Sequence, residues 1–245
     1  MESVPLQPGD WAFVLGNWPV LAQGLYVTVL LTVGSLLLGF LAGFPAGAVE
    51  VYGAGPLRSV VRGAGVLLRG TPIVVLIVLF FFGAPWPDLG GLPLGGWLLV
   101  PRFDVNGRAL LAATTALGLR SAAYQSQVFR GAIRSIDEGQ MEAARAINLS
   151  TFQAVRHVVL PQALRRSIPG FQNEFTIVLK DTSIAIAIGL GELLFQGRQL
   201  FLQPGQSAVV EVVFVISAVY FVLTFATNRT LDLVERRYAI PEEST

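Results

Sequence analysis

The sequence contains an uninterrupted apolar run of membrane-spanning length. Leu25 to Phe44 reads LYVTVLLTVGSLLLGFLAGF and carries no charged residue. A helix needs about 20 mainly apolar residues to cross the hydrocarbon core of a bilayer, so this run predicts a transmembrane helix. The composition agrees, because 53% of the residues are hydrophobic and 13% are charged, whereas soluble domains are about a quarter charged. We therefore expect a membrane protein.

Four further segments have the length and apolarity of spans, although each carries at least one charge. They cover approximately residues 63–83, 109–129, 170–194 and 212–231. Together with residues 25–44 they predict an all-α membrane protein with five transmembrane helices, whose termini lie on opposite sides. The segment before the first span has no Lys or Arg, so it lacks the basic region of a signal peptide and we expect the first span to be retained. No long internal repeat is visible, and we expect a single domain, 1–245.

The positions of the basic residues predict the orientation of these helices. Lys and Arg accumulate in cytoplasmic loops because their translocation is disfavoured. With the N-terminus outside, twelve arginines lie on the cytoplasmic side, three lie outside, and Arg120 and Lys180 lie within spans. The twelve are Arg58, Arg62, Arg69, Arg130, Arg134, Arg145, Arg156, Arg165, Arg166, Arg229, Arg236 and Arg237, and the three are Arg102, Arg108 and Arg198. We expect the N-terminus outside and the C-terminus in the cytoplasm.

The stretch between the third and fourth spans, residues 130–169, is too polar to enter lipid and carries capping signals for two short helices. Ser135 stands three residues before Glu138, and Ser150 three before Gln153. Each pair has the pattern of a capping box, in which the two side chains satisfy amide groups at a helix start. This predicts one helix beginning near residue 135 and a second near residue 150.

The ends of the two helices are also signalled. Asn148 precedes the second helix, and Asn readily adopts left-handed backbone angles just past a helix end. The second helix is expected to stop near Leu160, because Pro161 disfavours helical geometry in the residue before it. The loop is therefore predicted to be a helix-turn-helix on the cytoplasmic face.

At these residues the sequence resembles the EAA loop of type I ABC importer permeases. The pattern of that loop is Glu-Ala-Ala, three residues, Gly, nine residues, and then Ile-x-Leu-Pro. This sequence matches every spacing, with Asn in place of Gly and Val in place of Ile. The matching residues are Glu142, Ala143, Ala144, Asn148, Val158, Leu160 and Pro161. The resemblance implies that the helix bearing Glu142 to Ala144 seats in a groove of an ATPase subunit, with small residues allowing close approach.

Three other segments resemble the polar amino acid branch of the same family. They read RGTP at 69–72, AAYQSQVFRGAI at 122–133 and NEFTIVLKDTSI at 173–184. The resemblance implies a permease of the bacterial inner membrane that imports an amino acid by alternating access. It implies pairing with a second permease, identical or homologous, and docking on two ATPase subunits that bind ATP and Mg. It further implies an external solute-binding protein that delivers the amino acid.

The sequence carries no pattern of a catalytic or metal site. It contains no G-x-x-x-x-G-K-[ST] phosphate loop, no G-x-S-x-G elbow and no H-E-x-x-H helix. It has no cysteine and one histidine, His157, which excludes thiolate metal sites and an imidazole cluster. A net charge of +1 provides no signal for a nucleic-acid partner. We expect a transport subunit with neither enzymatic activity nor a cofactor of its own.

Polar residues inside the spans are candidates for the translocation path. A charge near the bilayer centre costs about 2.5 to 3.5 kcal/mol, so Lys180 should face protein or water. Either it lines the path together with Thr182 and Ser183, or it and Asp181 form a structural pair that locks the fourth span against its neighbours. Arg69 is a further candidate, and Arg120 either contacts a substrate carboxylate or reaches toward the cytoplasmic headgroups.

Two other classes fit the same hydropathy. A secondary transporter would need no ATPase and usually shows inverted repeats, which we do not detect. A membrane assembly subunit would leave the helix-turn-helix unexplained. The segment 83–103 is rich in Gly and Pro and predicts an irregular external loop, with Trp86 and Trp97 suited to the headgroup region.

Overall fold

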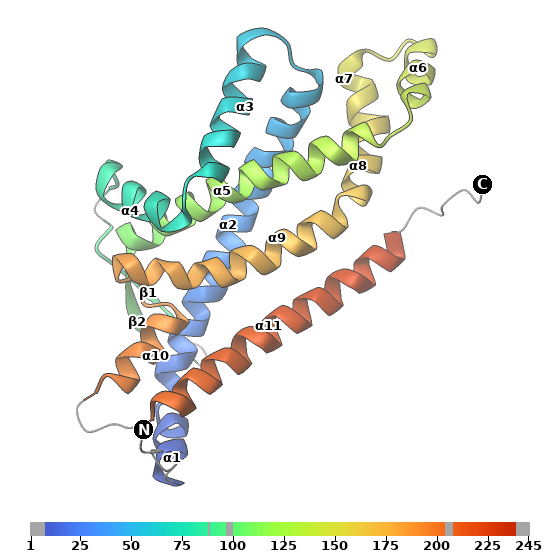
Figure 1. Ribbon diagram of the computed structural model, residues 1–245. Helices are drawn as coiled ribbons and strands as arrows, with labels where there is room; N and C mark the ends of the chain where they lie inside the picture. The colour runs from blue at the N-terminus through green and yellow to red at the C-terminus, as the bar shows by residue number, and fades with distance from the viewer. Residues whose placement is uncertain (1–7, 88, 97–99, 204–207, 239–245) are drawn as a thin grey trace. The chain divides into compact units, whose positions relative to one another are not determined.

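The computed structural model describes residues 8–87, 89–96, 100–203 and 208–238, which form a mainly helical chain with one small hairpin (Figure 1). The α-helices are α1 (Pro8–Gly16), α2 (Trp18–Tyr52), α3 (Gly55–Gly70), α4 (Ile73–Gly83), α5 (Gly107–Arg134), α6 (Glu138–Ala146), α7 (Thr151–Ala154), α8 (Leu160–Arg166), α9 (Ile168–Asp181), α10 (Leu193–Phe201) and α11 (Val209–Tyr238). A π-helical segment η1 (Val155–Val159) joins α7 to α8, and a 3-10 segment η2 (Thr182–Ile188) follows α9. Trp97 lies outside the described residues.

The chain forms two compact parts. The first part consists of Met1–Gly34, Ile73–Leu117 and Leu179–Thr224, and the second of Ser35–Pro72, Gly118–Val178 and Phe225–Thr245. Helices α2, α5, α9 and α11 each contribute residues to both parts.

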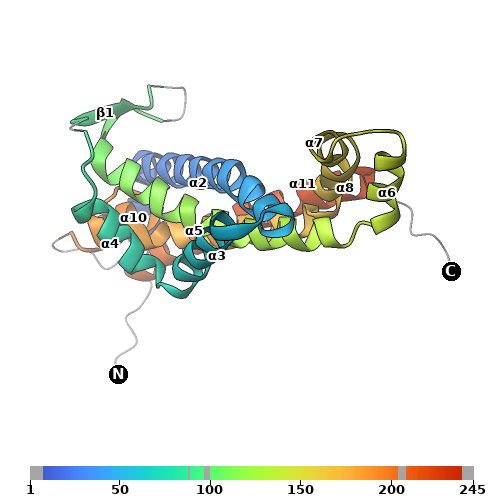
Figure 2. The same ribbon diagram turned by 90° about the horizontal axis from the view of Figure 1, so that it is seen from above.

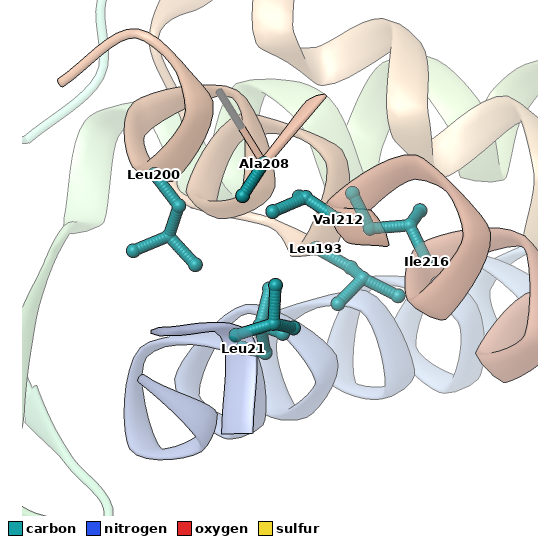
Figure 3. Packing of buried hydrophobic residues seen from close by; sticks show 7 residues of the cluster. Leu21, Leu193, Leu200, Ala208, Val212 and Ile216 are labelled. Carbon is teal, nitrogen blue, oxygen red and sulfur yellow. The ribbon is translucent and has the colours of Figure 1, made fainter. Parts of the chain in front are cut away.

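The core of the first part brings α1, α2, α10 and α11 together. Its buried side chains converge as shown in Figure 3, and they are Val14, Leu21, Leu193, Leu200, Ala208, Val212 and Ile216. A Cβ at Gly24 would stand 2.8 Å from the Leu193 Cα atom, so α2 and α10 approach more closely than a side chain permits. The backbone amide of Leu193 donates to the Thr28 hydroxyl at 3.1 Å. Glu192 is buried and caps α10 by accepting from the amides of Leu194 and Phe195.

In the second part, α2 and α5 pack at close range through glycines. A Cβ at Gly43 would lie 2.8 Å from the Ala122 carbonyl oxygen, and one at Gly47 would lie 2.8 Å from the Ser126 carbonyl oxygen. Small residues at intervals of about one turn are typical of helix pairs in membranes, where backbones rather than side chains meet. The fully buried Phe129 of α5 fills the space beside these contacts.

Two of the predicted spans are long, apolar helices. Helix α2 contains residues 25–44, and the Val209–Val234 section of α11 contains 212–231; both are long and apolar enough to cross a membrane. The pair α3 and α4 counts as a third span if the bent pair is taken together. The number of five spans therefore stays a prediction.

The predicted span at 63–83 consists of the second half of α3 and the whole of α4, with a break at Thr71 and Pro72. The chain leaves the helical conformation between Gly70 and Ile73. Pro72 disfavours helical geometry in the residue before it, and Thr71 accordingly has extended angles of φ −91° and ψ 130°. The Thr71 hydroxyl donates to the Leu67 carbonyl at 2.8 Å, which satisfies an acceptor at the end of α3.

The expected helix at 170–194 is also broken. Helix α9 ends at Asp181, tightens into η2 and stops at Gly189, whose φ is +72°. The Thr182 hydroxyl donates to the Leu179 carbonyl at 2.7 Å, three residues back, a short-range bond compatible with the tighter winding. Irregular backbone at membrane depth is tolerated where protein or water covers it.

Part of the predicted irregular loop forms an antiparallel hairpin. Strand β1 (Gly91–Leu94) pairs with β2 (Phe103–Asn106) in the first part. The glycines at 90, 95 and 96 have φ between +57° and +83°, which lets the chain turn at both ends of β1. Asn106 then caps α5 by accepting from the amide of Ala109 at 3.0 Å.

Candidate functional site

The polar loop of the second part folds into two helical segments connected by a tight turn. Figures 1 and 2 both show α6, α7 and α8 gathered beyond the end of α5. The N-cap of α6 is Asp137, whose carboxylate accepts from the Gly139 amide at 2.6 Å. The predicted cap at Ser135 is therefore wrong. The Ser135 hydroxyl instead donates to the Ala132 carbonyl at 2.9 Å. It does so because α5 continues to Arg134, which places Ser135 directly after the last turn of that helix.

The turn after α6 is made by Asn148, as the sequence predicts. Its φ is +62°, and no other described non-glycine residue has a positive φ. The amide of Asn148 donates to the Arg145 carbonyl at 2.9 Å, and the amide of Leu149 donates to the Ala144 carbonyl at 3.1 Å. This pair of bonds is a Schellman motif, which satisfies carbonyl groups that the end of α6 leaves without helical partners.

We predict that Asn148→Gly preserves this turn and that Asn148→Val disrupts it. Glycine reaches positive φ at no steric cost, whereas a β-branched residue carries a left-handed penalty of about 1 to 2 kcal/mol. Limited proteolysis of the loop in membranes measures the effect. A Val variant as resistant as the unaltered chain would show that the turn does not depend on this backbone conformation.

The second helical segment begins as predicted but ends later. Ser150 and Gln153 form a complete capping box at the start of α7. The helix does not stop near Leu160, because η1 carries the chain through Pro161 into α8. In η1 the Leu160 amide bonds to the Val155 carbonyl, five residues back. Pro161 has no amide hydrogen to donate within a helix. The wider π turn before it and its position at the start of α8 accommodate this lack.

The side chains of the loop divide into a buried and an exposed set. Ala144 is only 3% exposed, so it packs inside the loop, whereas Glu142 and Ala143 are exposed. Two large apolar side chains stand out on either side of the turn: Ile147 is 71% exposed and Phe152 is 73% exposed. Exposed apolar side chains that are paired around a turn in a polar loop are typical of a contact surface. The sequence interpretation missed both.

The loop is tied to α2 and α5 by a second core. Ile133 in the last turn of α5 and Ile136 just after that helix pack with Val159 of η1 and Ala163 of α8. Val51 of α2 packs against them. A cavity of about 300 Å³ lies between the last turn of α2, the end of α5 and α6. The Arg166 guanidinium also donates to the Ser135 carbonyl. The loop is therefore packed directly on these two long helices.

A buried carboxylate at the end of α2 was not among the sequence candidates. Glu50 is 4% exposed and accepts from Arg130 at 3.0 Å, from Gln127 at 3.0 Å and from Ser126 at 3.3 Å. Three donors compensate most of the cost of burying the carboxylate. The sequence carried only a weak signal for this site, because Glu50 is a single acidic residue shortly after an apolar run and its partner Arg130 lies 80 residues further along the chain.

The candidate path residues fall in different parts of the molecule. In the first part, Lys180 is exposed at the end of α9, Thr182 is buried, and Ser183 donates to the Lys180 carbonyl at 2.7 Å. In the second part, the Arg120 guanidinium lies 5.3 Å from the centre of the Tyr124 ring, a cation–π distance. Arg69 donates to the Ala123 carbonyl at 2.6 Å.

The profile of the family described as binding-protein-dependent transport system inner membrane component matches residues 35–240, which include the whole loop and both of its helices. The chain belongs to this family. It is a permease subunit of an ABC importer, and ATP hydrolysis is carried out by a partner ATPase. This confirms the resemblance seen in the loop and sets aside the alternatives of a secondary transporter and a membrane assembly subunit.

The permease is similar to curated amino acid permeases over nearly its whole length. It is 30% identical to the probable amino-acid permease protein YxeN of Bacillus subtilis, over 95% of this chain and 97% of the relative. It is 32% identical to the glutamine transport system permease protein GlnP of Escherichia coli, over 94% of this chain and 98% of the relative.

Solved structures agree with the fold of the permease. A crystal structure of an amino acid ABC transporter with histidines matches with a TM-score of 0.75 and 28% identity, over 93% of this chain and 98% of that chain. The MetNI methionine ABC transporter in an inward-facing conformation matches with a TM-score of 0.66 over 96% of this chain and 100% of that chain; at 21% identity it supports the fold alone. The mainly helical fold of a type I importer permease is thus confirmed, and its context is the inner membrane with ATPase and substrate-binding partners.

Proposed function

We propose that this permease forms the path by which a polar amino acid enters the cell in an ATP-driven importer. The support is the likeness to permeases whose names specify such cargo. These are glutamine in Escherichia coli, L-cystine in Bacillus subtilis and nopaline in Agrobacterium fabrum. In each the similarity covers 90% or more of this chain, so it includes the spans as well as the loop.

The proposed contact with the ATPase is the turn between α6 and α7, which we name the coupling turn (Ile147 to Phe152). The observation that carries this assignment is the exposure of Ile147 and Phe152 beside the turn that Asn148 makes at positive φ. Burial of such side chains in a partner groove stabilises a complex by about 1.5 to 3 kcal/mol each. Around them, Glu142 and Ala143 complete the exposed surface, and Ala144 supports it from inside.

The remaining residues of the EAA pattern hold the loop on its helices. Val158, Leu160 and Pro161 lie in η1 and at the start of α8. Because the neighbouring Val159 packs against the ends of α2 and α5, movement of the coupling turn reaches the spans. Alternating access requires this kind of rigid connection.

We further propose an assembly of two permeases, two ATPase subunits and an external solute-binding protein. The second permease is a copy of this chain or a homologue, and ATP and Mg are bound by the ATPases. Residues 1–245 act as one permease domain, since four helices contribute to both compact parts. Lys180, Thr182 and Ser183 on one part and Arg69 and Arg120 on the other are the proposed path residues.

We predict that the N-terminus is outside and the C-terminus inside. The basis is the twelve-to-three distribution of basic residues. Because the chain has no cysteine, a cysteine introduced at Ser3 or at Ser244 is the only thiol in that variant that can be labelled. An impermeant maleimide on intact cells should label the first and spare the second until the cells are opened. Labelling of both from one side would contradict a five-span arrangement.

The function itself is tested by reconstitution of the permease with its ATPase and binding protein in liposomes. The expected result is uptake of a polar amino acid that requires ATP and the binding protein. Uptake that persists without ATP would contradict the proposal and favour a secondary transporter.

A further inference from the structure

Helix α1 packs into the first part of the molecule on one side and exposes large apolar side chains on another. Val14 is 2% exposed and belongs to the core that α1 shares with α2, α10 and α11. Trp11 and Leu15, one turn apart on the helix, are both exposed, Leu15 to 67%. Trp18, the first residue of α2, is also exposed. We call Trp11, Leu15 and Trp18 the α1 surface.

The α1 surface lies beside the starts of two long apolar helices. Trp18 begins α2. The ring of Trp11 makes an edge-to-face contact with the ring of Phe214, near the start of α11, with the centroids 5.9 Å apart. Both α2 and this section of α11 are long and apolar enough to cross a membrane. Their starts share one core, and Figure 1 shows α1 beside both of them. Because such a helix begins where the hydrocarbon core begins, the α1 surface lies at one boundary of the membrane.

Exposed apolar side chains continue from the α1 surface along α11. Val210 and Phe214 at the start of α11 are exposed, and so is Phe221, two turns beyond Phe214. On a helix that crosses a membrane, an apolar side chain that protein does not cover faces lipid. The contact of Trp11 with Phe214 makes the α1 surface adjoin this side of α11. Lipid that covers the start of α11 therefore reaches α1 as well.

The two tryptophans suit the boundary between hydrocarbon and water. An indole ring is apolar, but its N–H group needs an acceptor, which is why tryptophan is enriched at membrane interfaces. Among the described residues, neither Trp11 nor Trp18 donates its indole N–H to a protein atom. Trp86 differs, because its indole N–H donates to the Phe80 carbonyl at 2.7 Å. Ester and phosphate oxygens of lipid headgroups are acceptors of the kind that Trp11 and Trp18 lack.

We infer that α1 is an interfacial helix, and that the α1 surface binds the headgroup and upper acyl-chain region of one lipid leaflet. The distribution of basic residues predicts that this is the outer leaflet. The other side of α1 packs with α10 and α11, so this lipid contact holds the starts of α2 and α11 at one depth. Such anchoring is independent of which solute the permease transports.

The test is depth-dependent quenching of tryptophan fluorescence in the full-length permease, in nanodiscs of phosphatidylcholine brominated either near the headgroup or near the chain ends. In one chain Trp11 is the only tryptophan, with the others replaced by Phe. A control chain has all four replaced and carries Phe221→Trp, seven residues beyond Phe214 and about 10 Å deeper along α11. Trp11 should lose most of its emission to the shallow bromine, and the control to the deep bromine. Iodide in the water should quench neither strongly.

A milder variant guards against misfolding of these chains. Replacing only Trp86 and Trp97 by Phe leaves α1 unaltered, and the emission of Trp11 and Trp18 together should show the same preference for shallow bromine.

Other patterns of quenching would overturn the inference. Stronger quenching of Trp11 by deep bromine would place α1 in the hydrocarbon interior. Strong quenching by iodide and by neither lipid would place the α1 surface in water. Iodide quenching that disappears when the external solute-binding protein is added would assign the surface to that protein. Quenching by neither iodide nor lipid would show that protein, such as a second copy of the permease, covers it.

Discussion

Phe152→Asp is expected to abolish ATP-dependent uptake while leaving the permease in the membrane at normal abundance. The side chain is 73% exposed on the coupling turn, so the fold of the loop does not depend on it. Loss of a buried Phe contact costs about 1.5 to 3 kcal/mol, and an unpaired carboxylate in an apolar groove adds a desolvation cost. The measurements are uptake in liposomes, co-purification of the ATPase and abundance of the permease.

Two control variants separate apolar contact from added charge. Phe152→Leu keeps an apolar side chain and should retain most of the uptake. Gln140→Glu adds the same charge at an exposed residue in the first turn of α6, outside the coupling turn, where an acid suits the helix dipole, and should have a much smaller effect. Normal uptake by Phe152→Asp, or an equal loss in Gln140→Glu, would contradict the assignment of Phe152 as an anchor for the ATPase.

The largest effect on folding is expected for Gly43→Leu in α2. The first side-chain atom would lie 2.8 Å from the Ala122 carbonyl oxygen and 2.9 Å from the Gln125 Cβ. The carbonyl belongs to the backbone of α5 and cannot turn aside, so the two helices must separate. Overpacking usually costs about 1 to 3 kcal/mol, and separating the helices also loosens the Phe129 core beside them. We expect little folded permease in membranes, measured by abundance and by thermal aggregation in detergent.

Gly63→Ala is the matched control for that substitution. Gly63 lies inside α3, and a Cβ there would have no atom within 4 Å. Alanine should be neutral or stabilising, because glycine inside a helix costs about 0.5 to 1 kcal/mol relative to alanine. Normal abundance of Gly43→Leu, or an equal loss for Gly63→Ala, would show that close α2–α5 packing is not what the fold requires.

Features set by neighbouring residues were predictable from the sequence. The turn at Asn148 and the capping box of Ser150 and Gln153 depend on bonds within about five residues, and both are confirmed. The apolar runs within α2 and α11 were likewise visible, because lipid selects for length and apolarity alone. The family was also recognisable from the sequence, because the EAA loop pattern is defined by the spacing of residues within one short segment.

Tertiary structure decided which of those residues are buried, which are exposed and where the helices break. Ala144 belongs to the EAA pattern and Ile147 does not, yet the packing of α6 against η1 buries the first and leaves the second 71% exposed. Glu50 gained its role only when α2 packed on α5 and brought Arg130, 80 residues away, within 3.0 Å. The capping box at Ser135 failed because α5 extended to Arg134, and the helix passed Pro161 because η1 took a wider turn. Local propensities differ by only a few tenths to about 1 kcal/mol per residue, and burial of a side chain or pairing of a charge at long range outweighs them.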